Sequence, residues 1–240
     1  FFQGFAGIFN CVEVSNSEEL AIQVDGKKQI LNLSEKESWS YINKEYGIRK
    51  YAPTLKCKSK HVEAAKSILN QFSNQGPSIA VHLKNGIRSS GKADWYNANV
   101  SEWLKFFRIA ESRFKCHFFL IGNEALPPEM NELSNVTITK EVDSNLITDL
   151  AIIEISQAYI GSTSGPAQMA YFGSSPYFSY KNPDHHVELM KSVVGTKSSF
   201  VFANPYQNVY RCHEECIRII SDFEKVFLGL TGKRPFEGLP

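Results

Sequence analysis

Hydrophobic positions along residues 59–240 follow two patterns in turn. Short, nearly continuous apolar runs of strand length are separated by segments whose apolar residues recur every three or four positions, as on one face of a helix. The apolar runs predict strands at 78–83, 116–121, 136–142, 158–161, 176–180 and 199–203. The segments with helical spacing predict helices at 59–72, 100–114, 127–133, 145–156, 166–172 and 214–230.

This alternation of strands and helices with short connections is typical of a parallel sheet that helices cover on both faces. We therefore predict an α/β fold with a Rossmann-like parallel sheet over residues 59–240. In such folds ligands bind beyond the carboxyl ends of the strands. The segments to inspect for a site are the loops that follow Leu83, Ile121, Val142 and Ile160.

Residues 1–58 are less regular and predict a small or partial α+β region in front of that domain. Strands are expected at 9–14 and 20–24, and Asp25-Gly26 predicts a hairpin that pairs 20–24 with 29–33. The residues 34–37 resemble the opening of a helix over 39–46. No residue pattern in this region indicates chemistry.

The turn after the fourth predicted strand is the sharpest candidate for a binding site. It reads Gly161-Ser162-Thr163-Ser164-Gly165-Pro166 and leads directly into a predicted helix. Ser164 or Gly165 fits the N-cap and Pro166 fits the first helical position. The unpaired amides of a helix start attract phosphate, and the three hydroxyls and Gln168 add polar contacts. The alternative is an ordinary capped helix; the turn matches neither a Walker loop nor a dinucleotide fingerprint.

Polar residues also follow the first predicted strand. His82, Lys84 and Arg88 lie at or just beyond its end, and Asp94 is the nearest carboxylate. Lysine and arginine can neutralise a diphosphate, and His82 or Asp94 can serve as an acid or base. The alternative is a solvated basic loop with His82 packed in the sheet.

Weaker signals follow the second and third strands. Gly122 and Asn123 would permit a ligand to approach closely at the end of the second strand. Glu141, Asp143 and Asp149 would accept hydrogen bonds from a ribose or a base. We favour the alternative that these acids are exposed groups near a helix start.

Composition narrows the function classes. The chain of 240 residues has 42% hydrophobic residues and a net charge of +1, which argues against nucleic-acid binding by bulk electrostatics. No apolar run is long enough for a membrane span. Five scattered cysteines favour reduced thiols and a cytoplasmic setting. The spacing of Cys212 and Cys216 fits one helical turn, but no second pair completes a zinc site, so we favour packed helix residues.

Two stretches of the chain resemble the C-terminal, nucleotide-sugar-binding half of GT-B glycosyltransferases. The first is Val81-His82-Leu83-Lys84 with the basic loop that ends at 94–97, similar to fucosyltransferase-like and bacterial surface-polysaccharide glycosyltransferases. The second, over 149–170, contains the turn from Gly161 to Pro166. The resemblance covers about half of the chain; Lys84 stands where such families often have arginine, and the segment before Ser78 is short for an acceptor-binding domain.

The resemblance implies a glycosyltransferase, or its donor-binding portion, that transfers a sugar from a nucleotide-diphosphate sugar to a glycan or other acceptor, such as a surface polysaccharide. The donor is a substrate, and no further cofactor is implied. No Asp-x-Asp pair of the kind that holds a metal occurs, so we expect metal-independent transfer. The alternatives are a non-catalytic module that binds a nucleotide or phosphosugar, and a sugar-nucleotide epimerase.

Overall fold

The structure is a computed structural model that describes residues 20–24, 27–31, 35–50, 52, 54–86, 97–142, 144–194 and 198–232. Its centre is a parallel sheet to which the described residues contribute six strands. These are β3 (Ser78–His82), β4 (His117–Leu120), β5 (Val136–Ile138), β6 (Ala158–Ser162), β7 (Tyr177–Lys181) and β8 (Gln207–Arg211). All six strands are short, and all except the edge strand β8 are largely buried, as expected for parallel strands covered on both faces.

The strands lie in the order β5-β4-β3-β6-β7-β8. The chain therefore starts in the middle of the sheet, runs outward to β5, returns to the middle and runs outward to β8. This order is that of a Rossmann-like fold, which confirms the predicted fold class. The direction of winding reverses between β3 and β6, and a crevice opens at the carboxyl ends of these two strands.

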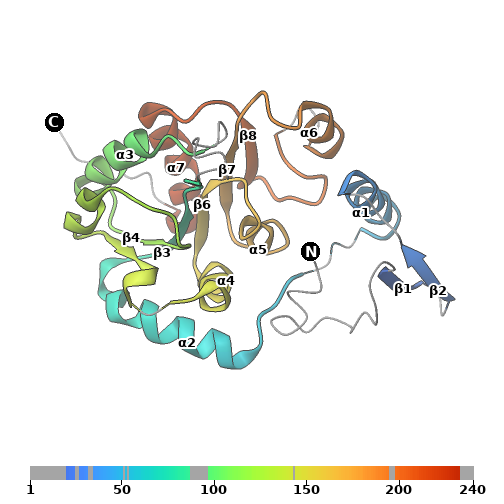
Figure 1. Ribbon diagram of the computed structural model, residues 1–240, viewed down its shortest axis with the longest axis horizontal. Coiled ribbons are helices and arrows are strands. Elements are labelled where there is room, and N and C mark those ends of the chain that lie inside the picture. Colours follow the sequence, from blue (N-terminus) through green and yellow to red (C-terminus); the bar gives the residue numbers. More distant parts are fainter. Residues whose placement is uncertain are drawn as a thin grey trace.

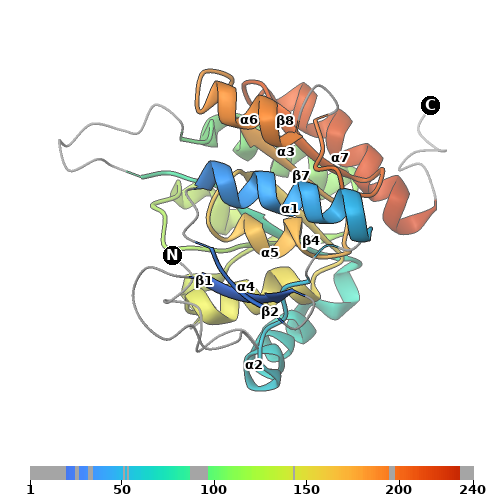
Figure 2. The same ribbon diagram turned by 90° about the vertical axis from the view of Figure 1, so that its right-hand side faces the viewer.

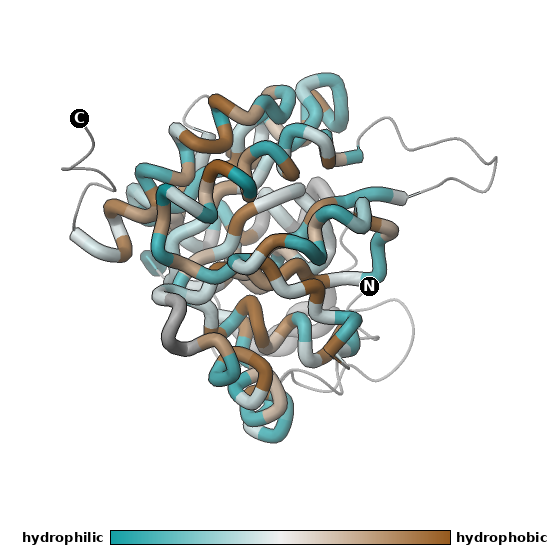
Figure 3. The backbone as a smooth tube through the Cα atoms, turned by 90° about the vertical axis from the view of Figure 1, so that its left-hand side faces the viewer, coloured by the Kyte–Doolittle hydropathy of each residue, from teal (hydrophilic) through white to brown (hydrophobic). Residues whose placement is uncertain are grey.

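Helices cover both faces of the sheet (Figures 1 and 2). One face packs against α3 (Val100–Arg113) and α7 (Cys216–Thr231). The other face packs against α2 (Ser59–Leu69), α4 (Leu146–Ile155), α5 (Ala167–Tyr171) and α6 (Val187–Val194). In Figure 3 the outer helices carry both hydrophilic and hydrophobic residues along their length, as helices with one buried face do.

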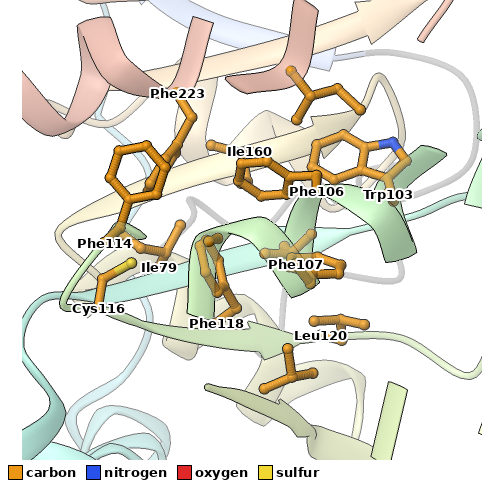
Figure 4. Packing of buried hydrophobic residues seen from close by; sticks show 14 of the residues in the cluster. Ile79, Trp103, Phe106, Phe107, Phe114, Cys116, Phe118, Leu120, Ile160 and Phe223 are labelled. Atoms are coloured by element: carbon orange, nitrogen blue, oxygen red, sulfur yellow. The ribbon is translucent and has the colours of Figure 1, made fainter. Parts of the chain in front are cut away.

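Aromatic residues fill the space between the sheet and the face of α3 and α7 (Figure 4). The rings of Trp103 and Phe106 meet edge to face at 5.7 Å, and Phe106 meets Phe118 and Phe223 in the same manner. All four residues have no exposed surface. Close aromatic packing of this kind stabilises the core beyond simple burial of area, and it fixes α3 against the sheet.

The predicted sixth strand at 199–203 is wrong, because the strand that completes the sheet is β8. Most of the apolar residues at 199–203 pack against the core without forming a strand. Phe200 is buried, and its ring stacks on the ring of Phe202 at a centroid distance of 5.3 Å. The edge strand β8 includes polar residues, so no continuous apolar run predicts it. The helix α6 was also not predicted, and the third predicted strand ends early, at Ile138.

The N-terminal part contains the predicted hairpin and helix. The strands β1 (Leu20–Val24) and β2 (Lys27–Leu31) pair antiparallel, and α1 covers Glu35–Arg49. Trp39 of α1 stacks on Phe172 at 5.7 Å and on Phe200 at 4.8 Å. The helix therefore lies against the α5 side of the sheet (Figure 2). The strand predicted at 9–14 falls outside the described residues.

Candidate functional site at the crevice between β3 and β6

A pocket of about 370 Å³ lies at the carboxyl ends of β3 and β4, beside the turn that leads into α5. Its volume is within the range of pockets that hold small ligands. The lining combines residues from four segments that are far apart in the sequence. They are His82, Lys84, Gly122, Asn123, Glu124, Leu146, Asp149, Ser164, Gly165 and Pro166.

Gly161 allows β6 to lie close to β3 under this pocket. Its φ is +130°, and a Cβ at this position would collide with the carbonyl of His82. Immediately beyond, the amide of Lys84 donates to Oγ of Ser162 at 3.1 Å. A side chain replaces the backbone acceptor at this point because the two strands diverge. The local sequence thus fixes where the crevice opens.

The turn from Ser164 to Pro166 forms one wall. The helix α5 begins at Ala167, and the amide of Gln168 donates to the carbonyl of Gly165 at 3.1 Å. Within the described part of the chain, the amides of Ser164 and Gly165 have no hydrogen-bond acceptor. Because both residues line the pocket, this wall can donate hydrogen bonds to an anionic group. The helix has only five residues, so its dipole adds little to this attraction.

His82 and Glu124 form a hydrogen-bonded pair at the pocket. Nε2 of His82 lies 3.0 Å from Oε1 of Glu124, and His82 is only 4% exposed. Burial alone would raise the pKa of Glu124, but the hydrogen bond and the charge of His82 lower it below its ordinary value. The carboxylate therefore accepts, and Nε2 donates. Within the described residues, Nδ1 of His82 and Oε2 of Glu124 are buried and have no partner.

Asp149 fixes the loop that follows β4. Its Oδ2 accepts from the amide of Gly122 at 2.9 Å, and its Oδ1 accepts from the hydroxyls of Thr139 at 2.8 Å and Ser144 at 2.6 Å. Gly122 has a φ of +99°, and a Cβ there would collide with the carboxylate of Glu124. Asp149 is thus a buried structural acceptor rather than the exposed helix-start acid that we favoured from the sequence.

The fold brings together most of the residues that the sequence predicted for a site. His82, Lys84, Gly122, Asn123, Ser164 and Gly165 all line the pocket. Ser162, Thr163 and Gln168 are near it in the chain but are not among its lining residues. Ser162 is 4% exposed, and the amide of Thr163 donates to Tyr180. Arg88 and Asp94 fall outside the described residues.

Sequence reasoning missed three of the lining residues and misjudged Asp149. Glu124 carried a usable signal, because it directly follows the Gly122-Asn123 pair at a strand end. Leu146 is 51% exposed and gives the pocket an apolar wall. It follows Asn145, whose side chain caps α4 by accepting from the amides of Ile147 and Thr148. Pro166 was assigned only a role in starting the helix.

The cysteine pair near the C-terminus does not share a helix turn. The helix α7 begins at Cys216, so Cys212 lies in the preceding loop. Burial raises the pKa of both thiols. In the described residues, no group of three or more histidine, cysteine, aspartate or glutamate side chains is arranged to hold a metal ion. None of the described helices is long and apolar enough to cross a membrane.

Comparison of the chain with protein-family models, with curated proteins and with solved structures finds no match. The geometry of the pocket and the chemistry of its lining therefore carry the information on function.

Proposed function

We propose that this chain is a glycosyltransferase, or the donor-binding portion of one, that uses a nucleotide-diphosphate sugar. The observation that carries the proposal is the pocket at the reversal point of a Rossmann-like sheet. Ligands of such sheets bind at this position. Six residues that the sequence predicted for the site line it together, five of them predicted for donor binding and His82 as an acid or base.

The pocket offers different chemistry on its different walls. The unpaired amides of Ser164 and Gly165 and the ammonium group of Lys84 suit the diphosphate. The exposed Leu146 and the amide side chain of Asn123 suit the base and the ribose. In this proposal Lys84 stabilises the leaving diphosphate as its charge develops, and His82, held by Glu124, is the acid or base candidate.

The two carboxylates of the pocket, Glu124 and Asp149, repel an anionic ligand less than free carboxylates would. Asp149 accepts three hydrogen bonds, one of them from a backbone amide. Glu124 is paired with His82, and the positive charge of Lys140 also lowers its pKa. Hydrogen bonding and opposite charges thus offset both negative charges locally.

Binding is tested by calorimetric titration of the full chain with UDP-, GDP- and ADP-sugars, followed by an assay for slow hydrolysis of the donor. Binding with hydrolysis supports a transferase, binding without turnover supports a non-catalytic module, and conversion between donor epimers supports an epimerase. If none of these donors binds, the proposal is refuted. We expect activity to persist in a chelator, because no metal-binding Asp-x-Asp pair occurs in the sequence. We place the protein in the cytoplasm, since its cysteines are scattered.

A matched pair of variants tests the location of the site. Leu146→Glu adds a carboxylate to the pocket wall at a position that is 51% exposed. Repulsion of the diphosphate should weaken donor binding about tenfold or more, because about 1.4 kcal/mol suffices for that change. Ile217→Glu makes the same change on α7, where the side chain is 77% exposed and outside the pocket lining. Equal donor affinity in the two variants would remove the pocket from the proposal.

A further inference from the structure

Two cationic residues end neighbouring strands on the far side of β6 from Lys84. Lys181 ends β7 and Arg211 ends β8, and the two are paired in the parallel register. Paired residues of neighbouring strands lie about 5 Å apart and point to the same face. Ser179, two residues before Lys181, bonds to the hydroxyl of Tyr171 at 2.8 Å. Both cations therefore lie on the α5 side of the sheet.

The chain that follows β7 forms a fixed turn beside these cations. The amide of His185 donates to the carbonyl of Asn182 at 3.1 Å, and the amide of Asp184 donates to the side chain of Asn182 at 2.9 Å. Nη2 of Arg211 donates to the carbonyl of Pro183 at 2.7 Å. Arg211 thus holds the turn, and the turn holds the imidazole of His185 near the ends of β7 and β8.

His185 lies close enough to Lys181 and Lys84 for their positive charges to act on its imidazole. The pKa of His185 is lowered to about 4, first by burial and then by the positive charges of Lys181, His186 and Lys84. Lys84 therefore lies within electrostatic reach of both this group and the pocket. In the described residues Arg211 has no carboxylate partner, and its Nε is buried without a hydrogen-bond acceptor.

We propose that Lys181, His185 and Arg211 form a second anion site, next to the pocket, that takes a phosphate group of a second substrate. None of the three residues lines the pocket. Lysine supplies a compact positive charge, arginine supplies directed N–H donors, and imidazole supplies one more donor. The site also lies at the carboxyl edge of the sheet, where ligands of this fold bind.

The anion site itself does not depend on the identity of the ligand in the first pocket. Its role rests on the proposed function, in which the second substrate is a glycosyl acceptor that carries a phosphate. The position fits this role, since Lys84 connects the two sites and Lys181 lies two strands away, about 10 Å across the sheet. An acceptor bound there would approach the donor from the β7 side.

The site is tested by titrating the full chain with inorganic phosphate and measuring the affinity by calorimetry. We expect Lys181→Gln and His185→Gln each to weaken phosphate binding at least about fivefold, a loss of about 1 kcal/mol. The matched control is Lys66→Gln, an exposed lysine of α2 that pairs with Glu63. An affinity in Lys181→Gln equal to that of Lys66→Gln overturns the proposal.

A second titration separates this site from the pocket. Phosphate is titrated into two samples. One is the wild-type protein saturated with the nucleoside diphosphate of the best donor, and the other is the Leu146→Glu variant. If phosphate still binds in both cases and still depends on Lys181, the sites are distinct. If the nucleotide displaces the phosphate competitively, the cations belong to the donor site and the proposal is wrong. If no nucleotide binds, the proposed function fails, while the titrations of Lys181→Gln and of Leu146→Glu still decide the anion site.

Discussion

Glu214 is a buried carboxyl group whose ionisation should control the stability of the fold. Its Oε2 accepts from the amide of Asn99 at 2.6 Å and from Nε1 of Trp103 at 2.9 Å. The residue is 9% exposed. Burial raises its pKa from 4.5 to about 7, although the two hydrogen bonds act in the opposite direction. Glu214 thus joins the start of α3 to the loop before α7.

The size of the effect follows from this pKa. The folded protein prefers the protonated form of Glu214. The stability that this group contributes is therefore complete below its unfolded pKa of 4.5 and is lost as the pH rises through its folded pKa of about 7. The full cost of ionising the buried group is about 3 kcal/mol. Between about pH 5 and about pH 8, Glu214 should lower the free energy of unfolding by about 2 to 3 kcal/mol.

The assay is urea unfolding of the wild type, Glu214→Gln and the matched control Glu215→Gln across this pH range. Glutamine keeps an oxygen acceptor for Asn99 and Trp103 but cannot ionise, so Glu214→Gln should lose the downward slope. Glu215 is the exposed neighbour, and its variant should follow the wild type. If the curves of the wild type and Glu214→Gln run parallel, the assignment of a raised pKa to Glu214 is refuted.

Two further substitutions test the framework of the pocket, with the urea unfolding midpoint as the measurement. Gly161→Ala should destabilise the protein by about 2 kcal/mol or more, because the new Cβ meets the carbonyl of His82 at a φ of +130°. The control Gly47→Ala lies in a helix with open space around it and should be neutral or slightly stabilising. Asp149→Asn should cost about 2 kcal/mol, since an amide offers fewer acceptor sites to its three donors, which include the amide of Gly122. A midpoint for either variant within error of the wild type would contradict the corresponding argument.

The sequence alone determined the class of the fold and the loops at which a site could lie. The apolar runs of β3, β4 and β6 hide both faces of each strand, so they are visible without knowing their neighbours. Because parallel strands end at a common edge, the loops after Leu83, Ile121 and Ile160 could be predicted to meet there. His82, Lys84, Gly122 and the turn at Ser164 were predictable as site residues on this ground.

Tertiary structure alone decided which side chains face one another. Glu124 gained its role from the distance to His82, and Asp149 from three donors that lie on separate elements. The strand β8 contains polar residues because it lies at the edge of the sheet, so its place depends on its partner β7. Lys181 and Arg211 became neighbours only through the register of these strands. A periodic pattern reports the burial of each residue along its own element, whereas a site depends on distances between elements.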